Sequence, residues 1–451
     1  MMRHFTWLIA IGLANPVTAQ TPAVIPPRPT SVAIPNTLAG SALRAWLDAF
    51  NSADTARLHA YAQRYEPDLE IDGEIGFHEQ TGGFNLISIE RSEPRHVEFM
   101  VQERKSPMTA YGVIDMSATG PARVKARNLQ AVGPNASAAA LRIDAAARAR
   151  AVAGAAALLD TFYVFPDVAK RMGDSLRARL ARKDYDSYTN GVMFAARLND
   201  DLADIGHDKH MHVNYSARPL PVEKPRSPGA PPPEPSPEDS AREREFLAKA
   251  NCGFVKSEVL AGNVGYLKFN FFAEPDFCAA TASKAMNALA DTRAMIIDLR
   301  DNGGGSPPMV AFVSSYLFDR RTHLNDLWTR RTNETKEYWT RDSVSGRRFG
   351  GTKPVYVLTS AHTFSGAEEF TYNLKNLKRA TIVGEVTGGG AHPVNGHRID
   401  DHFIIGVPFA RAINPITHTN WEGVGVEPDI KVPAADALST VQRLLREKPP
   451  A

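Results

Sequence analysis

Strand-like and helix-like segments alternate in the second half of the chain, and this alternation constrains the fold more than any other sequence feature. Because a helix between two strands returns the chain to the same end of a sheet, the order predicts a largely parallel sheet with helices packed on it. A strand-rich tail, residues 403–432, is expected to extend or edge that sheet. The expected strands are 264–270, 294–299, 355–359 and 381–384, and the expected helices are 275–290, 307–318 and 365–377.

The turn after the third of these strands places a serine at the start of a helix. Phe370, Leu374 and Leu377 follow i, i+4, i+7 spacing, which marks one apolar face of a helix that begins near Ser365. Unpaired N–H groups and the positive end of the helix dipole gather at a helix start, so an oxyanion beside Ser365 would meet hydrogen-bond donors. Ser365 and Glu368 also have the spacing of a capping box. Local pattern alone favours the cap over a nucleophile.

Two glycine runs follow neighbouring strands of the expected sheet. Residues 303–305 come after the strand 294–299, and residues 388–390 come after the strand 381–384. Open αβ sheets place their sites at the carboxyl ends of their strands, so both runs and Ser365 are expected at one edge. Glycine lets the main chain approach a ligand closely, which makes Gly303, Gly388 and Gly389 candidates for substrate binding. The sequence contains neither the P-loop nor the dinucleotide fingerprint, which argues against a phosphate site.

Four segments describe the rest of the expected domain organisation. Residues 37–133 are expected to form an α+β module, with a helix first and antiparallel strands after it. The module weakly resembles nuclear-transport-factor-2-like (NTF2-like) domains, and we expect it to have a structural or interaction role. Residues 138–216 are expected to form a small helical domain. Residues 217–240 are rich in proline and read as an exposed linker, and residues 241–440 hold the αβ core.

Composition limits the kinds of partner that the protein is expected to bind and indicates its compartment. The formal charge of +2, from 52 basic and 50 acidic residues, does not indicate a nucleic-acid or membrane-surface partner. Residues 1–19 have the charged, apolar and small-residue regions of a secretory signal peptide, and the expected apolar runs are too short to span a bilayer. In an oxidising compartment Cys252 and Cys278 are hypothesised to form a disulfide, with two buried thiols as the alternative.

Three histidines, His207, His210 and His212, cluster where the helical segment gives way to an extended one. The sequence around them supplies too few carboxylate or thiolate ligands for a metal site, and the chain contains no H-E-x-x-H motif. We therefore expect no metal and no cofactor.

Four motifs in a fixed order, DLRDNGGG, TSAHTFSGAEEF, GEVTGGGA and WEGVGVEPDI, carry a family resemblance. They resemble the serine peptidase family that contains the carboxyl-terminal-processing (tail-specific) proteases, the tricorn core and interphotoreceptor retinoid-binding protein. The match covers roughly residues 150–435, and its helical leader is similar to the retinoid-binding-protein-like branch. The resemblance implies a ClpP/crotonase-like α/β core with Ser365 as the nucleophile. It also implies that the backbone N–H groups of Gly304 and Gly366 form the oxyanion hole.

The sequence departs from the tail-specific proteases in two places. A proline-rich linker stands where those proteases carry a peptide-binding PDZ domain, and Val386 stands where they carry a lysine base. The retinoid-binding-protein-like branch has a histidine after its helical leader and a glutamate before a Gly-Val-x-Pro-Asp motif. The resemblance implies that His210 is the base and that Glu422 orients its imidazole, directly or through another group. His207 and His212 are the alternative bases.

The sequence thus predicts an exported serine endopeptidase, periplasmic or extracellular, that hydrolyses peptides or proteins through an acyl-enzyme on Ser365. A second hypothesis is a non-catalytic carrier of apolar ligands on the same scaffold. The sequence leaves the oligomeric state and the cleavage specificity open.

Overall fold

A computed structural model describes residues 32–222 and 236–447 of the chain. The predicted signal peptide, residues 1–19, lies outside the described residues, as does the middle of the predicted linker. Within the described ranges, no helix combines the length and apolarity needed to cross a bilayer.

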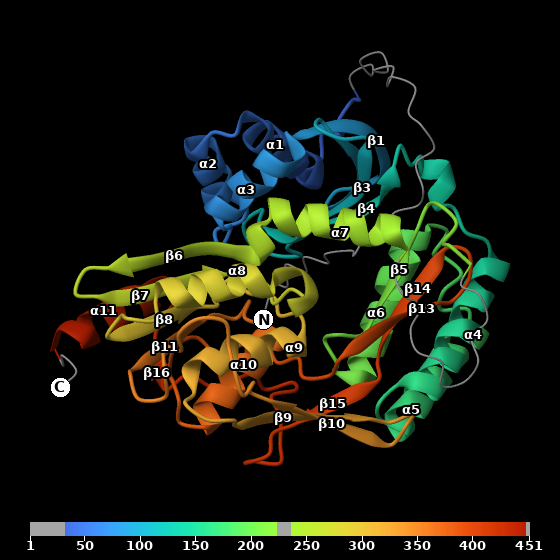
Figure 1. The fold of residues 1–451 in the computed structure, drawn as a ribbon. Coiled ribbons are helices and arrows are strands. Elements are labelled where there is room, and N and C mark those ends of the chain that lie inside the picture. The colour runs from blue at the N-terminus through green and yellow to red at the C-terminus, as the bar shows by residue number, and fades with distance from the viewer. Residues whose placement is uncertain (1–31, 223–235, 448–451) are drawn as a thin grey trace.

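The first module is α+β, as expected, and lies above the rest of the chain in Figure 1. Its strands form one antiparallel sheet in sequential order, and its helices pack on one face around Trp46, Phe50 and Phe99. The opposite face, with Met100 and Tyr111, packs on the helical segment that follows. The likeness to NTF2-like domains stays a prediction. Its elements are α1 (Leu38–Ser52), α2 (Thr55–Tyr65), α3 (Ile71–Thr81), β1 (Phe84–Glu93), β2 (His96–Glu103), β3 (Met108–Met116) and β4 (Val124–Pro134).

The helical segment shares its core with the tail of the chain. β5 pairs antiparallel with β14, which pairs with β13, so one small sheet joins residues distant in sequence. Leu159, Phe194 and Phe403 belong to the same buried cluster. This pairing fixes the turn that carries His210 against the αβ core. The elements are η1 (Ala138–Leu141), α4 (Ala145–Phe162), α5 (Pro166–Ala181), α6 (Gly191–Gly206), β5 (His212–Tyr215), β13 (Val394–Arg398) and β14 (Phe403–Pro408).

A six-stranded sheet in the order β16-β12-β11-β8-β7-β6 forms the αβ core, and β6 alone runs antiparallel to its neighbour. Helices α8, α9 and α10 cover one face and α11 covers the other, which confirms the predicted α/β class (Figure 1). Both faces are buried at the centre of the sheet, so the central strands β8 and β11 are mostly apolar rather than alternating. The elements are α7 (Pro237–Lys249), η2 (Asn251–Gly253), β6 (Phe254–Leu260), β7 (Val264–Phe269), α8 (Pro275–Ala288), β8 (Ala294–Asp298), α9 (Pro307–Ser314), η3 (Ser315–Leu317), β11 (Val355–Thr359), α10 (Gly366–Asn376), β12 (Thr381–Gly384), β16 (Ile430–Lys431), η4 (Ala434–Asp436) and α11 (Ala437–Glu447).

The tail differs from expectation. Only β16 joins the six-stranded sheet, as its edge, whereas β14 belongs to the sheet with β5. A further strand of the tail, β15 (Ala410–Ile413), pairs with β9 (His323–Thr329), which pairs with β10 (Glu334–Trp339). The prediction that the whole tail extends the main sheet was therefore wrong. The apolar residues of β14, such as Ile405, are instead buried against the helical segment.

Cys252 and Cys278 form a disulfide, which confirms the hypothesis drawn from the sequence. The bond joins η2 to α8, and the two cysteines are separated by 26 residues with Cα atoms 5.7 Å apart. Both cysteines belong to the buried hydrophobic core that α8 helps to form.

Replacing both cysteines by alanine is expected to lower the free energy of unfolding by about 3 kcal/mol, because the cross-link restricts the unfolded chain. Urea denaturation with and without reductant measures this difference, and reductant should leave the double variant unchanged. Two free thiols titrated in the unfolded, unreduced protein would contradict the bond.

Candidate active site

Three loops meet at the carboxyl ends of β8, β11 and β12. The N–H of Phe364 donates to the carbonyl of Asn302 at 3.0 Å, and the N–H of Gly388 donates to the carbonyl of Thr363 at 2.9 Å. The loop after β8 reaches Ser365 itself, because a Cβ atom added to Gly304 would lie 2.7 Å from Cβ of Ser365. With φ at +105°, Gly304 also has a conformation that favours glycine. The two glycine runs and Ser365 therefore lie at one edge of the sheet, as predicted from the sequence.

Ser365 has a strained backbone, with φ 53° and ψ −120°, at the N-cap of α10. Few residues other than glycine adopt a positive φ, and such strain persists only where the surrounding structure enforces it. A serine on a sharp turn between a strand and a helix is also the geometry that exposes a nucleophilic hydroxyl in α/β-hydrolases. The capping box predicted with Glu368 is present as well, and Ser365 is half-buried.

Glu368 does more than cap the helix. Its fully buried carboxylate accepts hydrogen bonds from the N–H of Ser365 at 2.9 Å, the hydroxyl of Thr387 at 2.5 Å, and the N–H groups of Gly389 at 2.6 Å and Gly390 at 2.8 Å. Burial raises the pKa of Glu368 to about 7, against the opposing effect of these donors. Glu368 thereby ties the second glycine loop to the turn of Ser365, a role that the local sequence pattern did not reveal.

Most N–H groups of the predicted glycines are already used within the protein. Gly304 donates to Oδ1 of Asn302 at 2.9 Å and Gly303 donates to the carbonyl of Asn270 at 3.1 Å. Gly388 and Gly389 donate to Thr363 and Glu368, as described above. Gly366 opens α10, where N–H groups have no acceptor within the helix. The substrate and oxyanion roles of these glycines stay predictions.

His210 lies in the turn after α6, with its ring against Phe364, the residue before Ser365. The ring centroids of His210 and Phe364 are 4.7 Å apart. The backbone N–H of His210 donates to Asp208 Oδ1 at 3.1 Å. Burial, the largest effect, lowers the pKa of the His210 imidazole to about 4. A neutral imidazole can accept a proton, so His210 is available as a base across the physiological range.

Glu422 joins His210 from the distant tail. One ligand atom each of Asp208, His210 and Glu422 lie within 4.8 Å of one another. Glu422 Oε2 accepts the Ala391 N–H at 2.5 Å. Burial and then the charge of Asp208 raise the pKa of the Glu422 carboxyl. Two fully buried atoms of this group, His210 Nδ1 and Glu422 Oε1, have no hydrogen-bond partner among the described residues.

His392 and Asp208 complete the group, and the sequence reasoning did not assign either a role. His392 Nδ1 lies 2.6 Å from Asp208 Oδ2 and 3.4 Å from Glu422 Oε2, while the Tyr163 hydroxyl lies 3.4 Å from Asp208 Oδ2. The available signals were the position of His392 two residues after the second glycine run and that of Asp208 two residues before His210. His392 thus connects the carboxylates that flank His210.

Comparison with known families identifies this architecture. Residues 263–432 match the model for peptidase family S41, and residues 136–251 match that for the N-terminal domain of this family in eukaryotic IRBP. The chain belongs to peptidase family S41. Both matched ranges agree with the resemblance drawn from the motifs, and the α+β module precedes them.

Named relatives of this S41 chain match it only in part. It is 28% identical over 188 residues to carboxyl-terminal-processing peptidase 2, chloroplastic, from Arabidopsis thaliana, covering 40% of this chain and 34% of that protein. It is 26% identical over 170 residues to C-terminal processing peptidase, chloroplastic, from Tetradesmus obliquus, covering 38% and 35%. A solved photosystem II D1 C-terminal processing protease is 25% identical, covers 39% of this chain and 44% of that one, and has a TM-score of 0.32. The S41 chain spans about a third of the length of its curated relatives.

The alternative bases of this S41 chain lie in other surroundings. His207 is an exposed helix C-cap with φ 51°. The His212 Nδ1 lies 2.8 Å from the carbonyl of His210, and its ring packs on Gly406 of β14.

The α+β module borders the loop that carries Ser365. His362, in that loop, lies 3.6 Å from the carboxylate of Glu70 at the N-cap of α3. Glu70, the main cause, raises the pKa of His362. The module that precedes the S41 match therefore stands beside the candidate active site.

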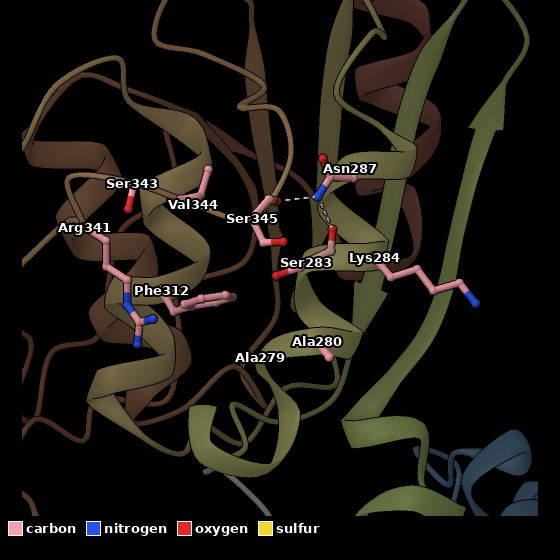
Figure 2. Close-up of a pocket in the computed structure, with 10 residues that line it drawn as sticks. All are labelled: Ala279, Ala280, Ser283, Lys284, Asn287, Phe312, Arg341, Ser343, Val344 and Ser345. Atoms are coloured by element: carbon pink, nitrogen blue, oxygen red, sulfur yellow. Dashed lines mark hydrogen bonds between the residues drawn. The ribbon is translucent and has the colours of Figure 1, made fainter.

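A cavity of about 690 Å³ lies elsewhere on the S41 core (Figure 2). All of its lining residues come from α8, α9 and residues 341–345. Serine side chains, Asn287 and Arg341 line it together with apolar residues such as Phe312, and Lys284 extends away from the other labelled side chains. We assign it no part in the candidate active site.

Proposed function

We propose that the chain is a serine peptidase that cleaves peptide bonds through an acyl-enzyme on Ser365, with His210 as the base and Glu422 as its orienting carboxylate. The observation that carries the proposal is the strained Ser365 at the start of α10, next to the Phe364 ring on which His210 packs. Membership of family S41 supports the same reaction.

The residues divide the reaction into two steps. His210 takes the Ser365 hydroxyl proton as the oxygen attacks the scissile carbonyl, and then gives that proton to the leaving amine. The oxyanion faces the start of α10, where the Gly366 N–H is a donor. The Gly304 N–H becomes the second donor when it exchanges its hydrogen bond to Asn302 for one to the oxyanion. We propose that, once His210 is protonated, its Nδ1–H donates to Glu422 Oε1; both atoms lack a hydrogen-bond partner in the resting site, and this new bond would stabilise the imidazolium. Water, deprotonated by His210, then releases the acyl group.

The proposed substrates are peptides or proteins in the periplasm or outside the cell. Two features support export: the leader pattern of residues 1–19, and the disulfide, which persists in oxidising compartments. The curated relatives are named for carboxyl-terminal processing, and an analogous peptide substrate fits this chain. The near-neutral charge gives no support to a nucleic-acid substrate.

Labelling with a fluorophosphonate probe tests the nucleophile, because the probe reacts with activated serines. The wild type is expected to be labelled and Ser365→Ala to be unlabelled. Ser343→Ala, which alters an exposed serine of the distant cavity, is the matched control and should label like the wild type. Absence of labelling in the folded wild type, with retained binding of a fluorescent apolar ligand, would favour the carrier hypothesis.

A further inference from the structure

We propose that Asp208, His210 and Glu422 bind a divalent transition-metal ion, best matched by Zn²⁺, and that the bound ion reversibly inhibits the peptidase. The binding site rests on the geometry alone, and only the inhibition rests on the proposed function. The ion is a ligand that blocks the site rather than a cofactor of the reaction.

The first argument is the ligand set. The three residues offer an imidazole nitrogen and two carboxylate oxygens within 4.8 Å of one another. Zn²⁺ bonds to such atoms at about 2.0–2.2 Å, so a closing movement of about an ångström would bring all three into its coordination shell. A nitrogen ligand favours zinc and its transition-metal neighbours over Ca²⁺ or Mg²⁺, which prefer oxygen. The turn around His210 alone lacks this set, because Glu422 arrives from the distant tail.

The second argument is that two of the three residues have an unpartnered ligand atom, whereas the oxygens of Asp208 already have partners. His210 Nδ1 and Glu422 Oε1 are fully buried and have no hydrogen-bond partner in the part of the chain that the structure describes. Buried polar atoms are normally satisfied, so two unsatisfied atoms in one group indicate a site that a ligand can complete. An ordered water is the other occupant of such a site, and a metal ion would displace it.

The third argument is charge and support. Asp208 and Glu422 bring two carboxylates together in a buried place, with His392 between them. A divalent cation would relieve the repulsion between these two carboxylates. Groups that hold metal ligands in place strengthen metal binding, and here His392 and Tyr163 contact Asp208 while the Ala391 N–H holds Glu422.

Occupation of the site would disable the proposed base. If the ion takes Nδ1 of His210 and Oε1 of Glu422, the imidazole loses the carboxylate that orients it and its affinity for the serine proton falls. Zinc would therefore slow acylation of Ser365, and a chelator would restore it.

The test is calorimetric titration of the chelator-treated full chain with zinc chloride. The wild type is expected to bind one ion. Glu422→Gln and His210→Ala each remove a direct ligand, so their affinity should fall by more than the about 10–100-fold that loss of an outer-shell partner costs. Glu422→Gln preserves the shape of the side chain, so it remains informative if His210→Ala fails to fold. His323→Ala removes a different histidine–carboxylate pair, 2.7 Å from Asp326, and should bind like the wild type.

Two outcomes would overturn the site: no zinc binding by the wild type, or equal binding by wild type, Glu422→Gln and His210→Ala. Ser365→Ala separates this inference from the proposed function, because it lacks the nucleophile but keeps every ligand. Zinc binding by Ser365→Ala without probe labelling of the wild type would reject the peptidase and retain the site. Probe labelling of the wild type that zinc leaves unchanged would reject the inhibition.

Discussion

Replacement of His210 by alanine is expected to lower kcat on a peptide substrate by about three orders of magnitude or more, because Ser365 then has no base to take its proton. Residual hydrolysis should remain, since the helix start still offers N–H donors to the oxyanion. Steady-state kinetics measure the effect, and circular dichroism shows whether the variant is folded. A loss in kcat without a large change in KM would assign the effect to the chemical step.

Glu422→Gln should cost less activity and should change its pH dependence. The raised pKa of Glu422 means that its carboxylate is lost at a higher pH than usual, so wild-type kcat/KM should fall as the pH drops below neutral. In Glu422→Gln this acid limb should move towards the lower pKa of His210, about 4.

Near-normal turnover by His210→Ala, together with inactivity of His207→Ala or His212→Ala, would show that the base is assigned to the wrong histidine.

Glu368→Gln is expected to have the second largest effect. The amide keeps one acceptor oxygen, so its NH₂ group must face either the Thr387 and Gly389 donors or the Ser365 and Gly390 donors. Two buried donors then lose their acceptor, which should lower the free energy of unfolding by about 3 kcal/mol. The Ser365 turn and the second glycine loop would separate, and kcat/KM should fall by about 10²-fold.

Glu369→Gln is the matched control for this change. Burial raises the pKa of Glu369 to about 8, so its side chain is largely neutral at pH 7 and a glutamine resembles it. Its activity at pH 7 should stay close to that of the wild type. Equal losses in Glu368→Gln and Glu369→Gln would indicate a general disturbance of α10 and remove the specific role of Glu368.

Local periodicity determined the secondary structure of the core. The predicted strands and helices between residues 264 and 384 agree with β7, α8, β8, α9, β11, α10 and β12 to within a few residues. Each of these elements buries a continuous apolar face, and such a face repeats with the period of its own backbone. The same reasoning located Ser365, because a helix start is marked by nearby residues.

Elements that pair over long distances were not readable in this way. The strands β6, β9 and β10 were not predicted, and β14 and β15 were assigned to the wrong sheet. An edge strand such as β6 is half exposed and lacks a strong apolar pattern. Which strand pairs with which depends on surfaces contributed by other segments, as with β14 and β5.

The sequence by itself thus determined the αβ core and the position of Ser365 at a helix start, whereas the structure decided that the two cysteines are bonded. Only the tertiary structure decided which groups surround that serine. It gave Glu368 its four donors, brought Glu422 to His210, and placed His392 between Asp208 and Glu422. The physical reason is that helices and strands follow from interactions between near neighbours, whereas a buried polar group is assembled from loops that meet only after the sheets have packed.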